Sequence, residues 1–424
     1  MKHTIREVVL ENGLKGLVIT IPNAPVVSLE ISFRAGEFLL SRQKWETAHI
    51  MEHLMLGANN NFASSREFQA ELEKNGAYSN ASTSAYDVTY DIECAAFEAD
   101  RVTNLVVQSL MEPQFLQSEF EAEFGNVAEE LIGRSNNHFR TLNLGIRVAQ
   151  GLYAVSDIER SKLMKHVTKQ DVEDHYKQTH SVANARFLLA GDSLDSCLAV
   201  LETLQLPSTI QRLPMPEEVP VQLEKPVLIV RKNVPNYYFY LDTYAPAALS
   251  SSERDSLSIL STILTETLHS KLLGTARERG LVYAMGSGHQ QLKSRTSFWL
   301  GAQVSKQNAQ QLFELTAQVL QECKNTGVTS AELEAAKMYL RGKHERSAQT
   351  ATGTLNEYSS SYYFDDTIEY EEHFVARLNQ VSVDSIKEVM QKVTSGVWTM
   401  GILGNLTEPE AEALYGIVKP VFAN

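Results

Sequence analysis

The stretch ETAHIMEHLML, residues 46–56, places three ionisable side chains within an otherwise apolar, helix-forming run. On a helix, residues four positions apart lie on one face, so His49 and His53 project together, with Glu52 beside them. Neutral imidazole is a preferred zinc ligand, and catalytic zinc sites use three protein ligands and keep a fourth position open. A nearby carboxylate can act there as the general base. The spacing HxxEH is the inverted zincin motif, and a helix with two surface histidines is the alternative interpretation.

A second acidic stretch, EAEFGNVAEELIGR at residues 121–134, offers a third ligand. Glu123, Val127 and Glu130 are spaced by four and seven positions, which places them on one face of a helix. Spacing alone does not separate Glu130 from its neighbour Glu129 as the ligand. A solvated acidic helix face is the alternative interpretation.

The length and composition indicate a large, ordinary globular protein. A chain of 424 residues exceeds what one compact core usually holds and predicts two domains of about 200 residues each. Hydrophobic residues make up 43% and charged residues 21%, which is a typical balance for a folded chain. The net charge of -14 disfavours nucleic acid and anionic membranes as partners and favours basic peptides.

The cysteines and the N-terminal residues give information on the cellular compartment of the protein. Cys94, Cys197 and Cys323 are widely spaced and form no CxxC pair, which favours a reducing compartment. Residues 1–22 mix charge into an alternating pattern and lack the continuous apolar segment of a secretory signal. No later run reaches membrane-spanning length. We therefore expect a cytoplasmic protein.

A proline-rich stretch divides the chain almost in half. It reads LPSTIQRLPMPEEVPVQLEKP and covers residues 206–226, where proline interrupts any regular element. We therefore predict an N-terminal zinc-binding domain over residues 1–205, a linker over 206–226 and a C-terminal domain over 227–424.

The two halves show the same order of patterns. Each has a strand, a helical pattern, a turn-rich segment leading into alternating apolar strands, and further helices. The strand, hairpin and later helices are expected over 26–38, 75–93 and 101–137 in the first half, and over 237–247, 279–304 and 307–347 in the second. This duplication predicts an α+β fold of two similar domains, each a mostly antiparallel sheet with helices packed on it.

The HxxEH and ExxxVxxE stretches together resemble the pitrilysin and mitochondrial processing peptidase family of zinc metallopeptidases. In that family a glutamate ligand follows HxxEH by about 77 residues and lies seven residues after another acid; here Glu130 is 77 residues after His53 and seven after Glu123. The resemblance implies that His49, His53 and Glu130 bind one zinc ion per chain. It also implies Glu52 as the general base and Glu123 as a group that supports the ligands.

Two further segments resemble parts of the same family. GAYSNASTSAYDVTYDIE resembles a hairpin whose exposed strand edge adds an extended peptide as another strand, which implies Asn80 and Ala81 as substrate-binding residues. A plain asparagine-rich turn is the alternative there. In ARERGLVY, Tyr283 matches a tyrosine that hydrogen-bonds the substrate carbonyl or oxyanion, although a tyrosine at the start of a strand is more often part of a core.

The sequence departs from the family at one catalytic position. The family arginine lies seven residues before the tyrosine, where this chain has Ala276, with Arg277 one position later. A one-residue deletion can bring Arg277 into that role, although the shift changes the helix phase by about 100°.

The resemblance implies a zinc-dependent endopeptidase that cleaves peptides or unfolded segments inside a clam-like chamber. Family members carry four such domains on one chain or build the chamber from two chains of about this length. A homodimer is therefore expected, with a heterodimer with a related chain as the other possibility. The alternative function is a non-catalytic partner subunit of a processing peptidase. The presence of every metal-binding and general-base position favours the enzyme.

Overall fold

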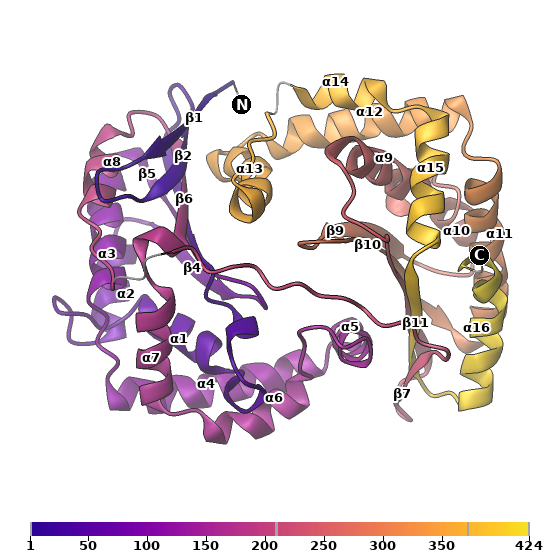
Figure 1. Cartoon of the computed structure of the whole chain (residues 1–424), viewed down its shortest axis with the longest axis horizontal. Coiled ribbons are helices and arrows are strands. Elements are labelled where there is room, and N and C mark those ends of the chain that lie inside the picture. The colour runs from indigo at the N-terminus through magenta and orange to yellow at the C-terminus, as the bar shows by residue number, and fades with distance from the viewer. Residues whose placement is uncertain (1, 208–210, 371–372, 423–424) are drawn as a thin grey trace. The chain divides into compact units, whose positions relative to one another are not determined.

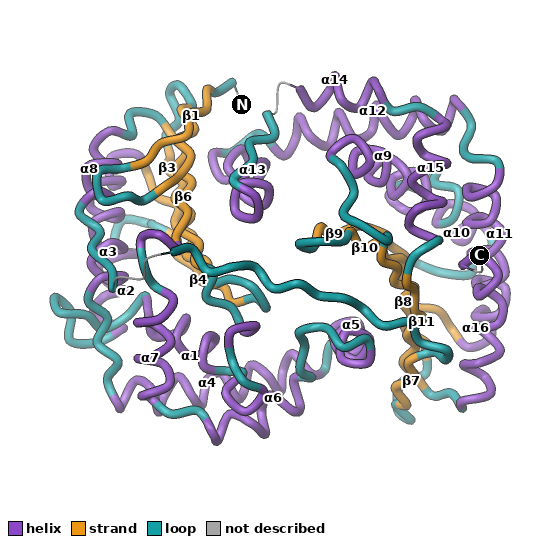
Figure 2. Tube along the Cα trace, in the orientation of Figure 1, coloured by secondary structure: helices purple, strands orange, loops and turns teal. Residues whose placement is uncertain are grey.

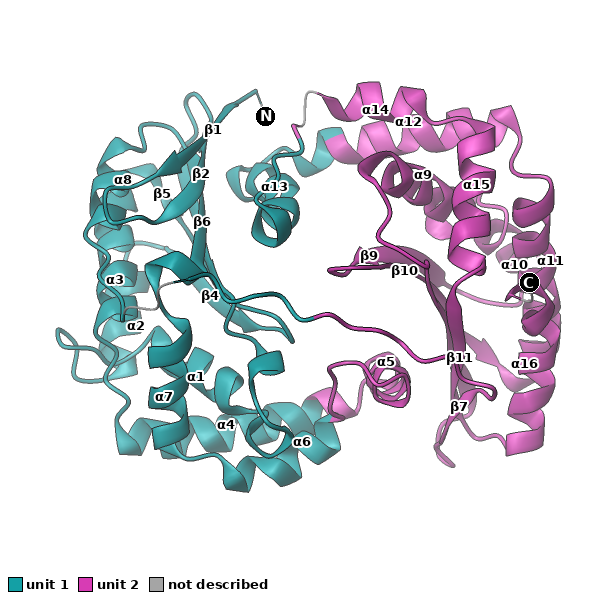
Figure 3. Ribbon diagram, viewed as in Figure 1, with its two compact units in different colours: residues 1–133, 157–216, 345–369 teal, residues 134–156, 217–344, 370–424 magenta. Residues whose placement is uncertain are grey.

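The structure, a computed structural model, describes residues 2–207, 211–370 and 373–422 (Figure 1). It forms two compact units, each assembled from separate segments of the chain (Figure 3). Unit 1 contains residues 1–133, 157–216 and 345–369, and unit 2 contains residues 134–156, 217–344 and 370–424.

Unit 1 is built on a six-stranded sheet. The strand order is β1 (Thr4–Val9), β2 (Lys15–Thr20), β6 (Ala185–Gly191), β3 (Val26–Phe33), β5 (Val88–Ala95) and β4 (Tyr78–Thr83). The β2–β6 pair is parallel and the other pairs are antiparallel. This order places β4 at one edge of the sheet, and β4 and β5 form the expected hairpin.

Helices cover both faces of this sheet. The larger core lies between one face and the helices α1 (Thr47–Met55), α2 (Ser65–Glu73), α3 (Ala99–Met111), α4 (Gln117–Ser135), α7 (Lys169–Thr179) and α8 (Asp195–Glu202). Alternate residues of β3, such as Leu29 and Ile31, point into it. On the opposite face α13 (Ala351–Asp365) packs its apolar residues on β2 and β6, and the hydroxyl of Ser359 donates to Glu30. Because both faces are covered, β3 is buried along almost its whole length.

Unit 2 repeats this plan with five strands. The order is β7 (Val227–Val230), β11 (Val397–Gly404), β8 (Asn236–Tyr244), β10 (Thr296–Ser305) and β9 (Met285–Gln291), and only the β7–β11 pair is parallel. Its main core includes residues of α9 (Ser251–Ser261), α10 (Leu273–Glu278), α11 (Ala309–Asn325), α12 (Ser330–Ser347), α14 (Phe374–Gln380), α15 (Val383–Thr394) and α16 (Glu408–Phe422). The other face of the sheet meets α5 (His138–Ala149), where Leu142 and Ile146 pack against Leu403.

The matching strand orders confirm the predicted duplication and the α+β class. Without β1, unit 1 reads β2-β6-β3-β5-β4, and unit 2 reads β7-β11-β8-β10-β9 with the single parallel pair at the same place. The alternation of strand and helix in each unit can be followed in Figure 2. The expected strands, hairpins and helices of both halves are all present.

The units differ from the contiguous domains expected over residues 1–205 and 227–424. The described part of 206–226 contains no helix or strand, as expected of a linker. However, residues 134–156 belong to unit 2 and residues 345–369 belong to unit 1. The reason is that each sheet buries its second face against a helix from the other half of the sequence, α13 on unit 1 and α5 on unit 2.

Two smaller expectations concern the cysteines and membrane spans. Cys94, Cys197 and Cys323 are buried and carry free thiols. Within the described ranges, no helix combines the length and apolar character that crossing a bilayer requires.

Candidate metal centre and catalytic residues

Helix α1 carries the HxxEH residues, of which His49 is buried and Glu52 and His53 are partly buried. Its apolar residues, including Ile50, Met51 and Leu54, are buried in the core of unit 1, and the helix packs on α7 and β4. His49 and His53 are one turn apart, with ring centroids separated by 5.0 Å and ring planes at 79°. The expected placement of both imidazoles on one face is confirmed.

The carboxylate of Glu130 on α4 lies close to both histidines. One of its carboxylate oxygens, Oε2, lies 3.2 Å from Nε2 of His49 and 3.5 Å from Nε2 of His53. Glu129 is exposed and has no such contact with these rings in the described structure. The structure therefore brings Glu130, and not Glu129, together with the two histidines. Spacing alone could not make this choice between the two glutamates.

Each histidine is held from behind by a carboxylate. Nδ1 of His49 lies 3.0 Å from Oε2 of Glu46, and Nδ1 of His53 lies 2.9 Å from Oε2 of Glu123. With a metal ion bound, an Nδ1–H that donates to a carboxylate would leave the Nε2 lone pair for the ion, which is the usual arrangement of a metal-binding histidine. The contact predicted for Glu123 is present, whereas Glu46 was not identified from the sequence.

Glu52 lies beside the two histidines, and its side chain is largely buried. Its Oε2 is 4.0 Å from Nε2 of His49 and accepts a hydrogen bond of 3.3 Å from the hydroxyl of Thr83 on β4. Burial raises the pKa of its carboxyl above the ordinary value, while the two histidines oppose the rise. A carboxylate with a raised pKa beside the cluster suits a general base better than an ordinary surface glutamate does.

The residues present fit a zinc ion. His49, Glu52 and His53 can bring one ligand atom each within 4.8 Å of one another, and Glu130 adds an oxygen close to both Nε2 atoms. Burial alone would lower the pKa of His49, but its bonds to Glu130 and Glu46 outweigh that effect and raise the pKa to about 9. Nitrogen and carboxylate donors in a negative surrounding are the donor set that zinc prefers.

The edge strand β4 borders this cluster. Asn80 is exposed, Ala81 is half-buried against the core, and β5 is the strand hydrogen-bonded to them. Among the described residues, no strand pairs with the outer edge of β4. Thr83 at the end of the same strand contacts Glu52, so an extended chain added along this edge would run toward the cluster.

Arg277 and Tyr283 are brought together in unit 2. A guanidinium nitrogen of Arg277 donates to the carbonyl of Tyr283 at 3.0 Å, and the guanidinium carbon lies 4.9 Å from the centre of its ring. Tyr283 is 82% exposed, so it is not a core tyrosine. Ala276, at the position of the family arginine, is buried in the core. The one-residue shift therefore places Arg277, and not the preceding position, beside the tyrosine.

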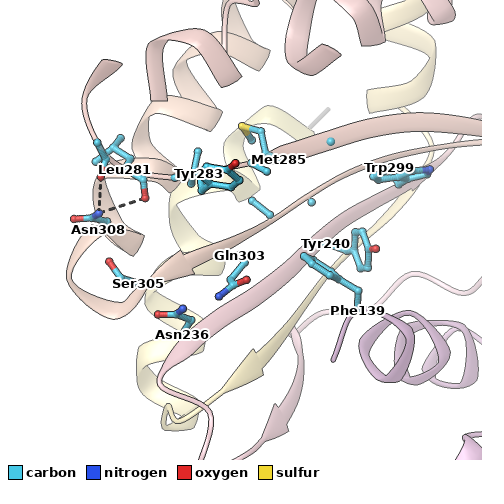
Figure 4. A pocket seen from close by; sticks show the side chains of 16 residues that line it. Phe139, Asn236, Tyr240, Leu281, Tyr283, Met285, Trp299, Gln303, Ser305 and Asn308 are labelled. Carbon is cyan, nitrogen blue, oxygen red and sulfur yellow. Dashed lines mark hydrogen bonds between the residues drawn. The ribbon is translucent and has the colours of Figure 1, made fainter. Parts of the chain in front are cut away.

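Tyr283 also lines a pocket that sequence reasoning missed (Figure 4). The pocket has a volume of about 520 Å³, and its walls include Phe139, Tyr240 and Trp299. Asn308 holds one rim by donating to the carbonyls of Gly280 and Leu281 at 3.0 and 3.3 Å. No local pattern marks this pocket, because α5, β8, β9 and β10 contribute residues far apart in the sequence.

Two sequence profiles of one family cover most of the chain. The profile described as Insulinase (Peptidase family M16) matches residues 17–146, and the profile described as Peptidase M16 inactive domain matches residues 166–340. The chain belongs to the M16 peptidase family. This confirms the resemblance to the pitrilysin family, in its half-length type with two domains.

Individual M16 relatives agree with this assignment. The zinc protease PqqE of Helicobacter pylori is 24% identical over 352 residues, which are 80% of this chain and 78% of that protein. The insulin-degrading enzyme of Drosophila melanogaster is 28% identical over 121 residues, which are 28% of this chain and only 12% of that protein. In fold, a solved protease from Helicobacter pylori matches 95% of this chain and all of its own, with a TM-score of 0.84 at 20% identity. A peptidase M16 inactive domain from Pseudomonas fluorescens matches with a TM-score of 0.82 at 17% identity, over 95% of this chain and 98% of its own.

The two halves of this M16 chain differ in their metal-binding residues. The helix of unit 2 that follows the central strand is α9, the counterpart of α1, and its sequence SSERDSLSILS contains no histidine. His49, Glu52, His53 and Glu130 all lie within the first profile, and Tyr283 lies within the second. The duplication therefore repeats the fold and not the HxxEH cluster.

Proposed function

We propose that this M16 chain is a zinc-dependent endopeptidase that hydrolyses peptides or unfolded segments of polypeptide. The observation that carries the proposal is that one carboxylate oxygen of Glu130 lies close to Nε2 of both HxxEH histidines. His49, His53 and Glu130 would hold one zinc ion per chain. When bound, zinc would polarise the peptide carbonyl and make a water molecule more acidic.

The protein's own residues would then move the proton and hold the substrate. Glu52 would accept a proton from the attacking water and pass it to the leaving amine. Tyr283, oriented by Arg277, would donate a hydrogen bond to the substrate carbonyl oxygen as negative charge develops there. The outer edge of β4 near Asn80 and Ala81 would pair with the extended substrate backbone.

Activity of the purified chain is the direct test of this function. We expect it to cleave a mixed peptide library, to lose activity when a chelator removes the metal, and to regain it when zinc is restored. Cut sites read by mass spectrometry would define the preference. A zinc-loaded chain that cleaves nothing by itself would favour the alternative, a non-catalytic subunit, which the description of the second profile as an inactive domain keeps open.

Folded proteins should resist cleavage. Only an extended backbone can pair with the β4 edge, so a chain whose hydrogen bonds are already used internally presents no free strand. We expect a stable folded domain to be cleaved at least about 10-fold more slowly than a destabilised variant of the same domain, because cleavage would follow the unfolded population. The measurement is the initial rate at equal concentration, and equal rates would contradict pairing at the strand edge.

We propose that the chain acts as a homodimer in which the zinc-binding unit of one subunit works with the Tyr283 unit of its partner. Glu52→Gln and Tyr283→Phe variants, each weakly active alone, should then complement each other under conditions where subunits exchange. About half of the dimers become mixed, and each mixed dimer has one intact site, so about a quarter of all sites should recover. Exchange without recovery would contradict the shared site, and full activity in a strictly monomeric chain would contradict the dimer.

A further inference from the structure

A buried ion network lies behind His49, on the Nδ1 side of its ring. Glu46 precedes α1, and its side chain is fully buried. Arg160 of α6 (Asp157–Leu163) donates to both oxygens of Glu46, through Nε to Oε1 and through a terminal nitrogen to Oε2 at 3.1 Å. The same terminal nitrogen donates to Glu37 at 2.6 Å.

This network makes Glu46 a fixed acceptor. An unpaired buried carboxylate is costly, but a guanidinium that contacts both oxygens compensates its charge and holds its plane. The side chains of Arg160 and Glu37 are only 7% and 8% exposed, so water has little access to the group. Oε2 of Glu46 is thereby held 3.0 Å from Nδ1 of His49.

We propose that Glu46, held in place by Arg160, is a positioning residue that sets the orientation and tautomer of His49 for metal binding. It accepts a hydrogen bond from Nδ1–H of His49, which keeps the proton on Nδ1 and leaves Nε2 to bind the zinc ion beside Glu130 and His53. The inference rests on the proposed zinc function, and it concerns residues to which neither the HxxEH motif nor the acidic helix stretch gives a role.

The carboxylate that supports His53 is more exposed to water than the carboxylate that supports His49. His53 and Glu123 are each 25% exposed, and Asn126 on the same helix also donates to Glu123 at 3.2 Å. Water can take the place of Glu123 at such a position, whereas the side chains of His49 and Glu46 are only 3% and 0% exposed. Loss of the Glu46 charge should therefore weaken zinc binding more than the equivalent loss at Glu123.

The test is the zinc dissociation constant of Glu46→Gln, measured by competition with a chelator. We expect it to rise by about 10-fold to 100-fold, the range found when a supporting carboxylate of a metal-binding histidine is changed. The visible spectrum of the cobalt-substituted variant should shift, because the orientation of one ligand changes. Glu123→Gln should show a smaller rise, and Glu159→Gln, on the same helix as Arg160 but paired at the surface with Arg42, should show none.

A second variant tests the same positioning role if Glu46→Gln does not fold. Arg160→Lys retains the positive charge but cannot contact Glu46 and Glu37 as a planar fork, so it should also weaken zinc binding. Thermal unfolding of the metal-free proteins identifies variants that have lost the fold. If the original protein binds zinc tightly and folded Glu46→Gln or Arg160→Lys binds it equally well, the positioning role is wrong. If the original protein binds no zinc, the proposed function itself fails.

Discussion

Glu52→Gln should keep its zinc and lose peptide hydrolysis. The amide is nearly the same size as the carboxylate and can still contact Thr83, so the metal-binding residues should stay in place. It cannot accept the proton of the attacking water, and removal of a general base lowers turnover by about 10²-fold to 10⁴-fold. The expected result is an unchanged zinc content by elemental analysis with kcat reduced by that factor.

A matched control separates this effect from a general loss of charge. Glu121→Gln on the exposed side of α4 removes one carboxylate of the same unit without touching the cluster, and its kcat should stay unchanged. If Glu52→Gln retains normal turnover, Glu52 is not the base. If it loses zinc as well, the residue is a ligand or is needed for the shape of the site, and the division of roles proposed here is wrong.

Glu130→Ala should lose zinc, whereas Glu129→Ala should keep it. The two glutamates are neighbours on one helix with the same intrinsic chemistry, but only Glu130 directs an oxygen at Nε2 of His49 and His53. Loss of a direct ligand should exceed the effect of changing a supporting residue, so zinc affinity should fall by more than about 100-fold. Activity should fall with the zinc content.

The paired variants control for each other. Both shorten a glutamate to alanine at adjacent positions of α4, so any effect on helix stability is shared. His49→Ala and His53→Ala should behave like Glu130→Ala. Retention of full zinc in Glu130→Ala together with its loss in Glu129→Ala would overturn the ligand assignment.

The features that were predicted correctly depend on short-range patterns. The spacing of His49 and His53 determines that they share a face of α1, and the alternating residues of 75–93 determine the β4–β5 hairpin. The repeated order of such patterns revealed the duplicated α+β fold. Helix and strand periodicity is encoded within a few residues, so it is readable without knowledge of the rest of the chain.

The choice between Glu129 and Glu130 shows where local reasoning stops. A helix places both on nearby faces, and the resemblance to the pitrilysin family was needed to prefer Glu130. The structure separates them, because the rotation of α4 about its axis is set by the packing of buried residues such as Val127 and Leu131 in the core. Helix rotation of this kind is a property of packing and not of spacing.

By itself, the sequence determined the HxxEH helix, the two repeated folding patterns and the family. Only the tertiary structure decided that α5 and α13 cover sheets formed mainly by the other half of the chain. It also decided that Arg160, 114 residues beyond Glu46, holds the carboxylate that supports His49. The physical reason is that burying a sheet face or a charged group depends on which surfaces meet in space, and contacts between distant segments leave no periodic signal in the sequence.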